Sequence, residues 1–281
     1  MDFFTCVVRA SLLVVASAVN ALAVENFVES PTGERMVIKV EQLDKWKDGR
    51  ENIQFVLNST AKTLWRHFPD RRVGELLVRP KGGPITLARR GPKGERYVWL
   101  DTGDAYWCQY TFQFAHEVGH VLTDNVHYDH RNMWFEESLC EVCSLFALKQ
   151  MADDWDKHAN GRWKRFVPSI RQYVKDRMDQ GKLPKGVNFQ KWFEDELPNF
   201  YGNHELRTKN LIVAKELLTL FESEPKHLAA ISYLNRGDIL KHKQFDQFLA
   251  NWHAHVPKAH KGFVASVASK FGIELPRTKP D

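Results

Sequence analysis

The sequence lacks internal repeats, low-complexity segments and long linkers, which excludes a repeat array and a string of separate domains. Its net charge is only +5 over 281 residues, and no nucleic-acid-binding motif accompanies it, so we expect no nucleic-acid partner. Beyond the N-terminal stretch, no apolar run approaches the roughly 20 residues that a membrane span needs. What remains is one folded unit, long enough to bury a substantial core without metal or disulfides.

One apolar run lies at the N-terminus. Arg9 precedes an apolar stretch that ends in small residues, and Ala21 and Ala23 occupy the two positions that a signal peptidase reads. We predict that residues 1–23 form a signal peptide cleaved after Ala23, which leaves residues 24–281 as a single exported unit, secreted or periplasmic. The alternative is an uncleaved anchor, which the shortness of the run disfavours.

The sequence is also poor in cysteine. Of its four cysteines, Cys6 lies in the predicted signal peptide, and Cys108, Cys140 and Cys143 remain. Because disulfides form in exported proteins, we expect a bridge from Cys108 to Cys140 or Cys143, with the third thiol buried. The cysteines and scattered histidines do not have the spacing of a four-ligand structural zinc site, which disfavours a cysteine-ligated metal.

A histidine motif is the most informative feature of the chain. His116 and His120 are four residues apart, so on a helix they share one face and can bind one metal, while Glu117 reaches the bound water. The mostly apolar segment 107–121 predicts a helix buried beneath a cleft. Gly119 weakens that helix, which suggests close approach by a neighbouring backbone or by substrate. The alternative is a pair of histidines on a buried amphipathic helix.

A catalytic zinc ion needs a third protein ligand and one open position. His127 is one candidate, but the metzincin pattern requires Gly and His three and six residues after the second histidine, where this chain has Thr123 and Val126. The other candidate is the segment 134–138, Trp-Phe-Glu-Glu-Ser, which opens a second helix. This segment resembles the tryptophan-hydrophobe-Asn-Glu-Gly segment of gluzincins, the thermolysin-like and aminopeptidase-like zinc enzymes.

The resemblance implies roles for three glutamates. Matched to the gluzincin pattern, Glu137 is the third ligand, Glu136 stands where the aminopeptidase-like members have Asn, and Ser138 replaces Gly. Glu141, one turn further, becomes the partner that holds His116 through its other ring nitrogen. A change of helix phase would instead make Glu136 the ligand. Glu141 could also be an exposed glutamate or belong to a surface ion pair.

In this scheme, Glu117 is the general base that takes the proton of the zinc-bound water. Gluzincins stabilise the oxyanion with a Tyr or His from a later helix, and Tyr201 and His204 lie 64 and 67 residues after Glu137. Both are candidate catalytic residues. The competitors for this role are Tyr128, His130 and Tyr233.

Three predicted strands precede the histidine motif, at residues 75–79, 85–89 and 96–101. They look like the small twisted sheet of gluzincins, whose edge strand nearest the zinc helix pairs with substrate. That comparison makes the last strand the substrate-binding segment, which comprises Tyr97, Val98, Trp99 and Leu100. The alternative is an ordinary sheet strand.

Further helices are expected at residues 52–68, 162–178, 188–197, 205–221, 226–234, 245–255 and 262–271.

We therefore expect an α+β fold, with a small, twisted, mostly antiparallel sheet lobe at about 24–125 and a larger helical lobe at about 126–275. The active-site helix would lie between them, as in zincins. The expected function is that of an exported peptidase that uses one catalytic Zn²⁺ and acts on a peptide or protein substrate. We expect the protein to be a monomer. Cleavage inside peptides is favoured, because the Gly-x-Met-Glu-Asn segment of aminopeptidases is missing. The alternatives are an inactive, zinc-stabilised peptide- or protein-binding protein, and a structural helical protein with coincidental histidines.

Overall fold

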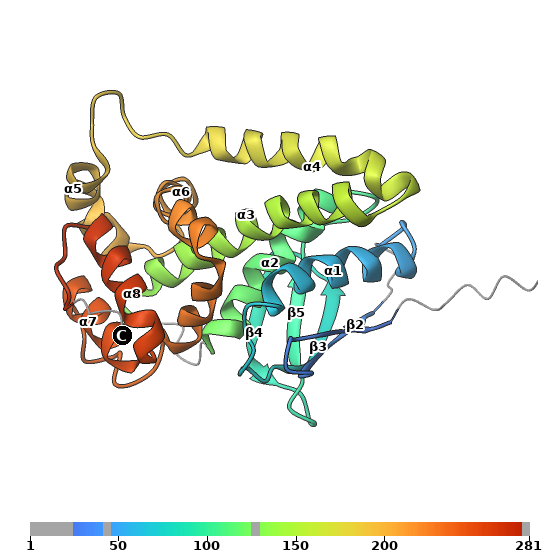
Figure 1. The fold of residues 1–281 in the computed structure, drawn as a ribbon, viewed down its shortest axis with the longest axis horizontal. Helices are drawn as coiled ribbons and strands as arrows, with labels where there is room; N and C mark the ends of the chain where they lie inside the picture. Colours follow the sequence, from blue (N-terminus) through green and yellow to red (C-terminus); the bar gives the residue numbers. More distant parts are fainter. Residues whose placement is uncertain (1–24, 42–45, 125–129, 277–281) are drawn as a thin grey trace, which may run out of the picture.

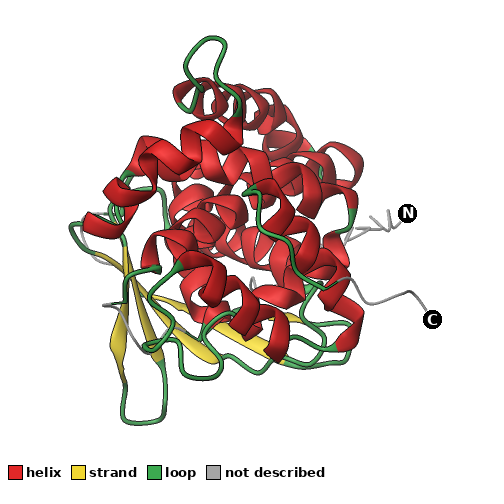
Figure 2. Ribbon diagram, turned by 90° about the vertical axis from the view of Figure 1, so that its left-hand side faces the viewer, coloured by secondary structure: helices red, strands yellow, loops and turns green. Residues whose placement is uncertain are grey.

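The computed structural model describes residues 25–41, 46–124 and 130–276. The predicted signal peptide with Cys6, and the candidates His127 and Tyr128, lie outside the described residues. Within them, helices and one small sheet occupy different sides of the molecule (Figures 1 and 2). This confirms the expected α+β class, with a sheet lobe and a helical lobe. No helix among the described residues is long and apolar enough to cross a bilayer.

The sheet is mixed. In spatial order its strands are β1 (Phe27–Glu29), β2 (Arg35–Val40), β3 (Gly74–Pro80), β5 (Arg96–Leu100) and β4 (Ile85–Arg90). The pairs β2–β3 and β3–β5 are parallel, while β1–β2 and β4–β5 are antiparallel. The expectation of a mostly antiparallel sheet was wrong, because helix α1 (Arg50–Trp65) joins β2 to β3 as a crossover and so aligns them in one direction.

The strand order also shows that the edge of the sheet is not the expected strand. β5, which carries Tyr97 to Leu100, lies between β3 and β4 and is paired on both sides. It cannot accept a further strand, so the prediction of a substrate-binding edge at these residues was wrong. The edge strand on this side of the sheet is β4, which follows β3 in the chain but pairs only with β5 among the described strands.

Eight α-helices and one 3₁₀-helix, η1, cover one face of the sheet and build the rest of the described molecule (Figure 2). After α1 they are α2 (Trp107–Thr123), α3 (Met133–His158), α4 (Gly161–Gln180), α5 (Phe189–Gly202), α6 (Arg207–Ser223), η1 (Pro225–Tyr233), α7 (Phe245–His255) and α8 (Lys258–Lys270). Helix α3 is the centre of this arrangement, since it packs against α1, α2, α4 and α6. Most of its side chains are buried, as expected for a helix enclosed on several sides.

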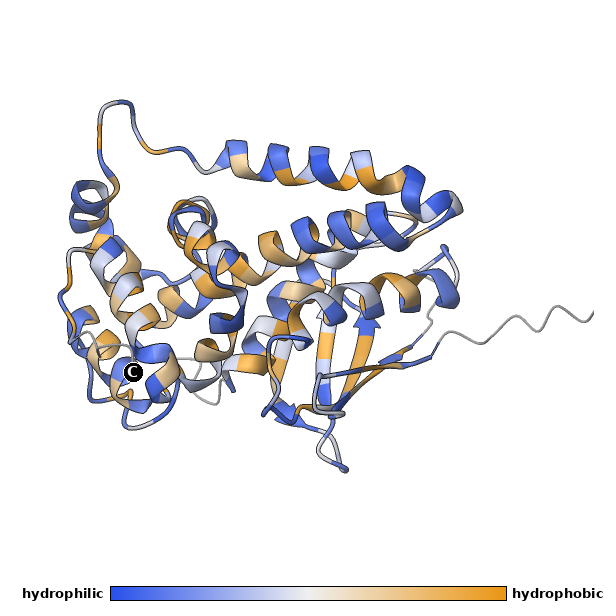
Figure 3. Cartoon of the chain, in the orientation of Figure 1, coloured by the Kyte–Doolittle hydropathy of each residue, from blue (hydrophilic) through white to orange (hydrophobic). Residues whose placement is uncertain are grey.

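Helix α4 runs back alongside α3 at the surface of the molecule (Figure 1). Hydrophilic residues mark its outward face, and hydrophobic residues face α3 (Figure 3). Only Val167 and Ile170 of this helix are buried, so its attachment rests on a narrow apolar stripe.

Helix α2 is fixed to the sheet at its C-terminal end. The helix ends at Thr123, and the next residue, Asp124, adopts a left-handed backbone conformation with φ 56°. One carboxylate oxygen of Asp124 contacts Arg71 at 3.4 Å, Arg90 at 3.5 Å and Arg96 at 2.5 Å. Because Arg90 ends β4 and Arg96 begins β5, these ion pairs fix the position of α2 over the edge of the sheet.

Helices α2 and α3 approach most closely at Gly119. A Cβ atom at this position would lie 2.8 Å from Cys140 Sγ and 3.1 Å from Cys140 Cα. The interpretation of Gly119 as a point of close backbone approach is therefore confirmed, and the neighbour is α3. Only glycine allows this spacing, which brings the two histidines of α2 next to the glutamates of α3.

The predicted disulfide is not formed. Cys108, Cys140 and Cys143 are all buried and free in the described structure. Cys140 of α3 lies beside Gly119 of α2. Gly119 is eleven residues after Cys108, a rise of roughly 16 Å along α2, so Cys140 is too far from Cys108 for a disulfide. Burial raises the pKa of the Cys108 and Cys143 thiols to about 12, so both remain protonated at neutral pH.

We predict that Gly119→Ala lowers the free energy of unfolding by about 1–2 kcal/mol, because the added methyl group overpacks the α2–α3 contact. Gly262→Ala is the matched control, since Gly262 lies inside α8 and a Cβ atom there would have no neighbour within 4 Å. That change should stabilise the protein by about 0.5–1 kcal/mol through helix propensity. Urea unfolding of both variants measures the difference, and equal effects would contradict this account of the contact.

Candidate metal centre

His116 and His120 lie one turn apart on α2, with ring centroids 5.1 Å apart. Each directs its Nε2 atom toward the carboxylate of Glu137 on α3. The distances are 3.1 Å from His116 Nε2 to Oε2 and 3.4 Å from His120 Nε2 to Oε1. The structure thus brings together the three residues that the sequence proposed as ligands. Glu137, rather than Glu136, faces both Nε2 atoms.

The other ring nitrogen of each histidine faces a second carboxylate. His120 Nδ1 lies 2.8 Å from Glu136 Oε1, and His116 Nδ1 lies 3.7 Å from Glu141 Oε2. Glu141 also accepts a hydrogen bond of 3.0 Å from Arg177 of α4, and because Glu141 is buried, this ion pair does not lie on the surface as the alternative interpretation had it. Contacts of this kind hold a ligating imidazole in one tautomer and orientation.

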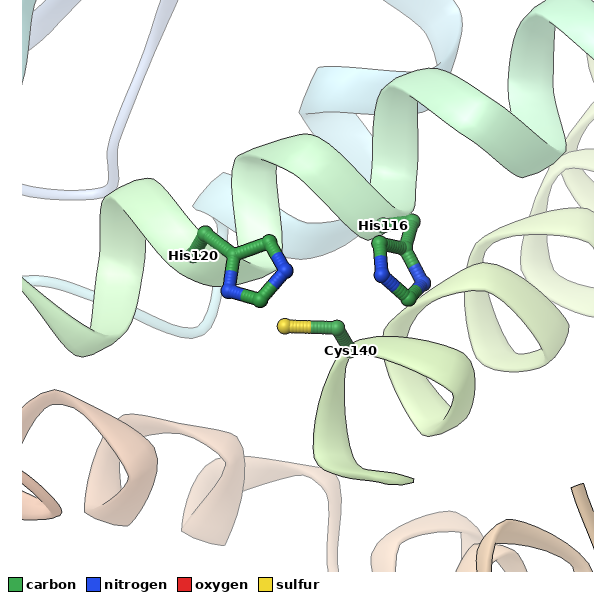
Figure 4. Close-up of side chains that lie close together, drawn as sticks. All are labelled: His116, His120 and Cys140. Carbon is green, nitrogen blue, oxygen red and sulfur yellow. The ribbon is translucent and has the colours of Figure 1, made fainter. Parts of the chain in front are cut away.

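Cys140 is a feature of the site that the sequence reasoning missed. Ligand atoms of His116, His120 and Cys140 lie within 4.8 Å of one another, and Figure 4 shows the thiol next to the two rings. Burial raises the pKa of the Cys140 thiol well above its usual value, and a metal binds the thiolate. Glu137 is already a carboxylate that contacts both Nε2 atoms, so we regard it as the better third ligand. The signal for Cys140 was its position one turn after Glu136, on the face of α3 that meets Gly119.

The residues present fit a divalent metal ion. Two imidazoles and one carboxylate form a common donor set of catalytic zinc sites, and they leave a fourth position open. In addition, Glu117 Oε2 is buried and has no hydrogen-bond partner among the described residues. A buried carboxylate oxygen without a partner costs free energy, so this atom indicates a ligand or water at the centre of the site.

Glu117 is anchored through its backbone and lines a cleft. Its carbonyl oxygen accepts a 3.0 Å hydrogen bond from the Thr86 hydroxyl of β4, which joins the edge strand to the histidine helix. Burial of the Glu117 side chain raises the pKa of its carboxyl group above the usual value. A carboxyl group with a raised pKa is suited to proton transfer near neutral pH.

The cleft has a volume of about 710 Å³ and contains the histidines, Glu117 and Glu137. The edge strand β4 forms one wall with Ile85 to Ala88, and α4 contributes Tyr173 and Arg177. The sequence did not indicate that β4 or α4 takes part in the site. Tyr97 to Leu100 are not among the residues that line this cleft, in agreement with the interior position of β5.

His204 and Tyr201, the two candidates for oxyanion stabilisation, occupy different environments. His204 lines the cleft. Tyr201 does not, because its hydroxyl accepts a 3.0 Å hydrogen bond from the backbone N–H of Phe245 and its ring packs under Arg131. The prediction for Tyr201 was therefore wrong, and the residue is a packing residue of the helical lobe.

The two competing candidates within the described residues, His130 and Tyr233, are not part of the cleft lining. The buried ring of His130 stacks on Phe248, and the ring of Tyr233 packs under the guanidinium of Arg236. Neither residue lines the cleft. His204 is thus the one candidate of this group that the structure places beside the proposed ligands, within the described part of the chain.

The chain matches no protein-family model, no curated protein and no solved structure significantly. The resemblance to gluzincins therefore rests on the residues of the site and on their arrangement.

The ligand assignment separates two variants. We predict that Glu137→Gln abolishes stoichiometric zinc binding, because it removes the carboxylate that faces both Nε2 atoms, whereas Cys140→Ser retains it. Metal content after dialysis against micromolar zinc, measured by atomic emission, decides between the two ligands. Loss of zinc from the Cys140→Ser variant alone would identify the thiol as the ligand.

Metal binding should also release protons. Burial lowers the pKa of both imidazoles, but contacts with Glu137 and Glu141 raise the pKa of His116, and contacts with Glu136 and Glu137 raise that of His120. Both metal-free imidazoles therefore keep a second proton to a higher pH than a free imidazole does, and a bound metal must displace that proton. We expect up to two protons released per zinc at pH 7, and fewer as the pH rises through the raised pKa values. Calorimetric titration in buffers of different ionisation enthalpy measures this number, and a value of zero at pH 7 would contradict the prediction.

Proposed function

We propose that the protein is a zinc-dependent peptidase. The observation that carries the proposal is the convergence of His116 Nε2, His120 Nε2 and the Glu137 carboxylate, with Glu117 beside them in the same cleft. Separately, each residue has an ordinary structural interpretation. Together they provide three metal ligands, an open coordination position and a general base, and hydrolysis by a metal-activated water requires these groups.

Glu117 carries the proton transfers in this proposal. When bound, zinc would lower the pKa of a coordinated water and polarise the substrate carbonyl. Glu117 Oε2, which has no protein partner in the described residues, is free to accept the proton of the water and to deliver it to the leaving amine. His204 at the cleft wall is the candidate donor to the oxyanion.

The edge strand suggests how a substrate would bind. Among the described strands β4 is paired on one side only, and Ile85 to Ala88 line the cleft directly beside Glu117. A peptide in extended conformation could add to this edge through backbone hydrogen bonds, which recognise the main chain of any sequence. The substrate-binding role expected for Tyr97–Leu100 therefore passes to β4. Cleavage inside a peptide remains the favoured mode, and export through the N-terminal apolar run remains part of the proposal.

Glu117→Gln tests the proposed chemistry. The amide keeps the size of the side chain but cannot accept the proton, so we expect kcat for peptide hydrolysis to fall by about 10²-fold or more. Zinc binding should be retained, because Glu117 is not a proposed ligand. A library of internally quenched fluorescent peptides measures turnover, and the metal content of the same samples is the control.

Two outcomes would contradict the proposal. Zinc-loaded wild-type protein that cleaves no peptide in the library would favour a zinc-stabilised binding protein. Wild-type protein without zinc at equimolar metal would favour a purely structural role for the histidines.

A further inference from the structure

Glu136 is a fully buried carboxylate at the back of the metal centre. Its exposed fraction is 0%, and it accepts hydrogen bonds of 2.8 Å from Thr123 Oγ1 and 2.7 Å from Asn235 Nδ2, besides its 2.8 Å contact with His120 Nδ1. Aminopeptidase-like gluzincins have Asn at this position, so the carboxylate is a departure of this chain from the pattern. It places a negative charge where the pattern has a neutral amide.

Asn235 reaches this site from a distant part of the chain. It follows η1, 99 residues after Glu136, and its Nδ2 atom also lies 3.4 Å from the carbonyl oxygen of Thr123. Its Oδ1 atom is buried and has no hydrogen-bond partner in the part of the chain that the structure describes. The Asn235 side chain is thus held by the hydrogen bond that its Nδ2 atom donates to Glu136.

The two donors from Thr123 and Asn235 determine how Glu136 holds His120. Glu136 is surrounded by donors, so it acts as an acceptor, and the hydrogen-bond network places the His120 proton on Nδ1. When a metal displaces the proton of Nε2, the lone pair of that atom faces the metal on the Glu137 side of the ring. The corresponding contact of His116 with Glu141 is longer, at 3.7 Å, and Glu141 is shared with Arg177.

We infer that Glu136, fixed by Asn235 and Thr123, is a positioning residue that strengthens metal binding by placing a negative charge behind His120. A carboxylate behind a ligating imidazole makes the ring a better electron donor than an amide does. Buried charge is costly without a counter-charge, and a divalent ion at the ligand side of His120 supplies one. The inference rests on the zinc site of the proposed function, but not on peptide hydrolysis.

Glu136→Gln isolates the effect of the charge. In this variant the Asn235 amide can turn over, so that its Oδ1 atom accepts from the new side-chain amide. The number of hydrogen bonds at position 136 is then kept, and only the long contact of Asn235 with the Thr123 carbonyl oxygen is lost. We expect zinc affinity, measured by competition with a chromophoric chelator, to fall by about 10–100-fold. Glu222→Gln is the matched control, because Glu222 on α6 pairs with Lys149 and does not line the cleft. Its zinc affinity should equal that of the wild type.

Asn235→Ala isolates the anchoring. Removing the donor to Glu136 Oε2 should weaken zinc binding by a smaller factor than Glu136→Gln does. Because Asn235 acts through Glu136, the double variant should bind zinc no more weakly than Glu136→Gln alone. The absorption spectrum of the cobalt-substituted protein should shift in both single variants, which a role in folding stability alone would not produce.

Wild-type zinc affinity in a folded Glu136→Gln variant would overturn the inference, and so would fully additive losses in the double variant. If Glu136→Gln does not fold, Asn235→Ala carries the test, and an unchanged affinity and cobalt spectrum there would overturn the inference. A wild-type protein that binds zinc but hydrolyses no peptide would refute the proposed function and leave this inference intact. A protein that hydrolyses peptides but whose zinc affinity does not change in Glu136→Gln or Asn235→Ala would refute this inference and leave the proposed function intact.

Discussion

The approach of α2 to α3 at Gly119 is the constraint on which the candidate site depends. Because Gly119 has no side chain, the α3 backbone at Cys140 can lie against α2, and a Cβ atom would stand only 3.1 Å from Cys140 Cα. This spacing lets Glu137 reach both histidines through one carboxylate group. The ion pairs of Asp124 with arginines of the sheet lobe fix the C-terminal end of α2, and the Thr86 hydrogen bond joins α2 to β4, so the histidines are held between α3 and β4.

A second property of the site is its excess of buried negative charge. The four glutamates at positions 117, 136, 137 and 141 surround two histidines, and Arg177 is the one guanidinium that contacts this group in the described residues. Without metal, the protons of the His116 and His120 rings, which lie in hydrogen-bond contacts with the glutamates, offset part of this charge. Burial would raise the pKa of Glu137, but the hydrogen bond with His116 and the charge of His120 lower it to about 2. A divalent ion could replace these protons, which links metal binding to the stability of the site.

Local patterns in the sequence predicted much of the fold and part of the site. Helix α7 begins and ends where expected, and helical spacing alone paired His116 with His120 on α2, whereas Glu137 and Glu141 of α3 were assigned through the resemblance to gluzincins. Helix α5 was expected to end at Leu197 but continues past Pro198 to Gly202, because tertiary packing of Phe200 against Trp134 outweighs the lost backbone hydrogen bond. Strand order, the role of β4, and the contact of Asn235 with Glu136 depend on chain pairing over long distances, which local periodicity does not encode.

X-ray absorption spectroscopy of the zinc-loaded protein tests the central claim most directly, because it reports the atoms that surround the metal. The account predicts a shell of nitrogen and oxygen atoms at about 2.0–2.2 Å, with the outer-shell scattering of two imidazoles and no sulfur. A sulfur atom at about 2.3 Å would place Cys140 in the coordination sphere, and the absence of imidazole scattering would contradict the assignment of His116 and His120.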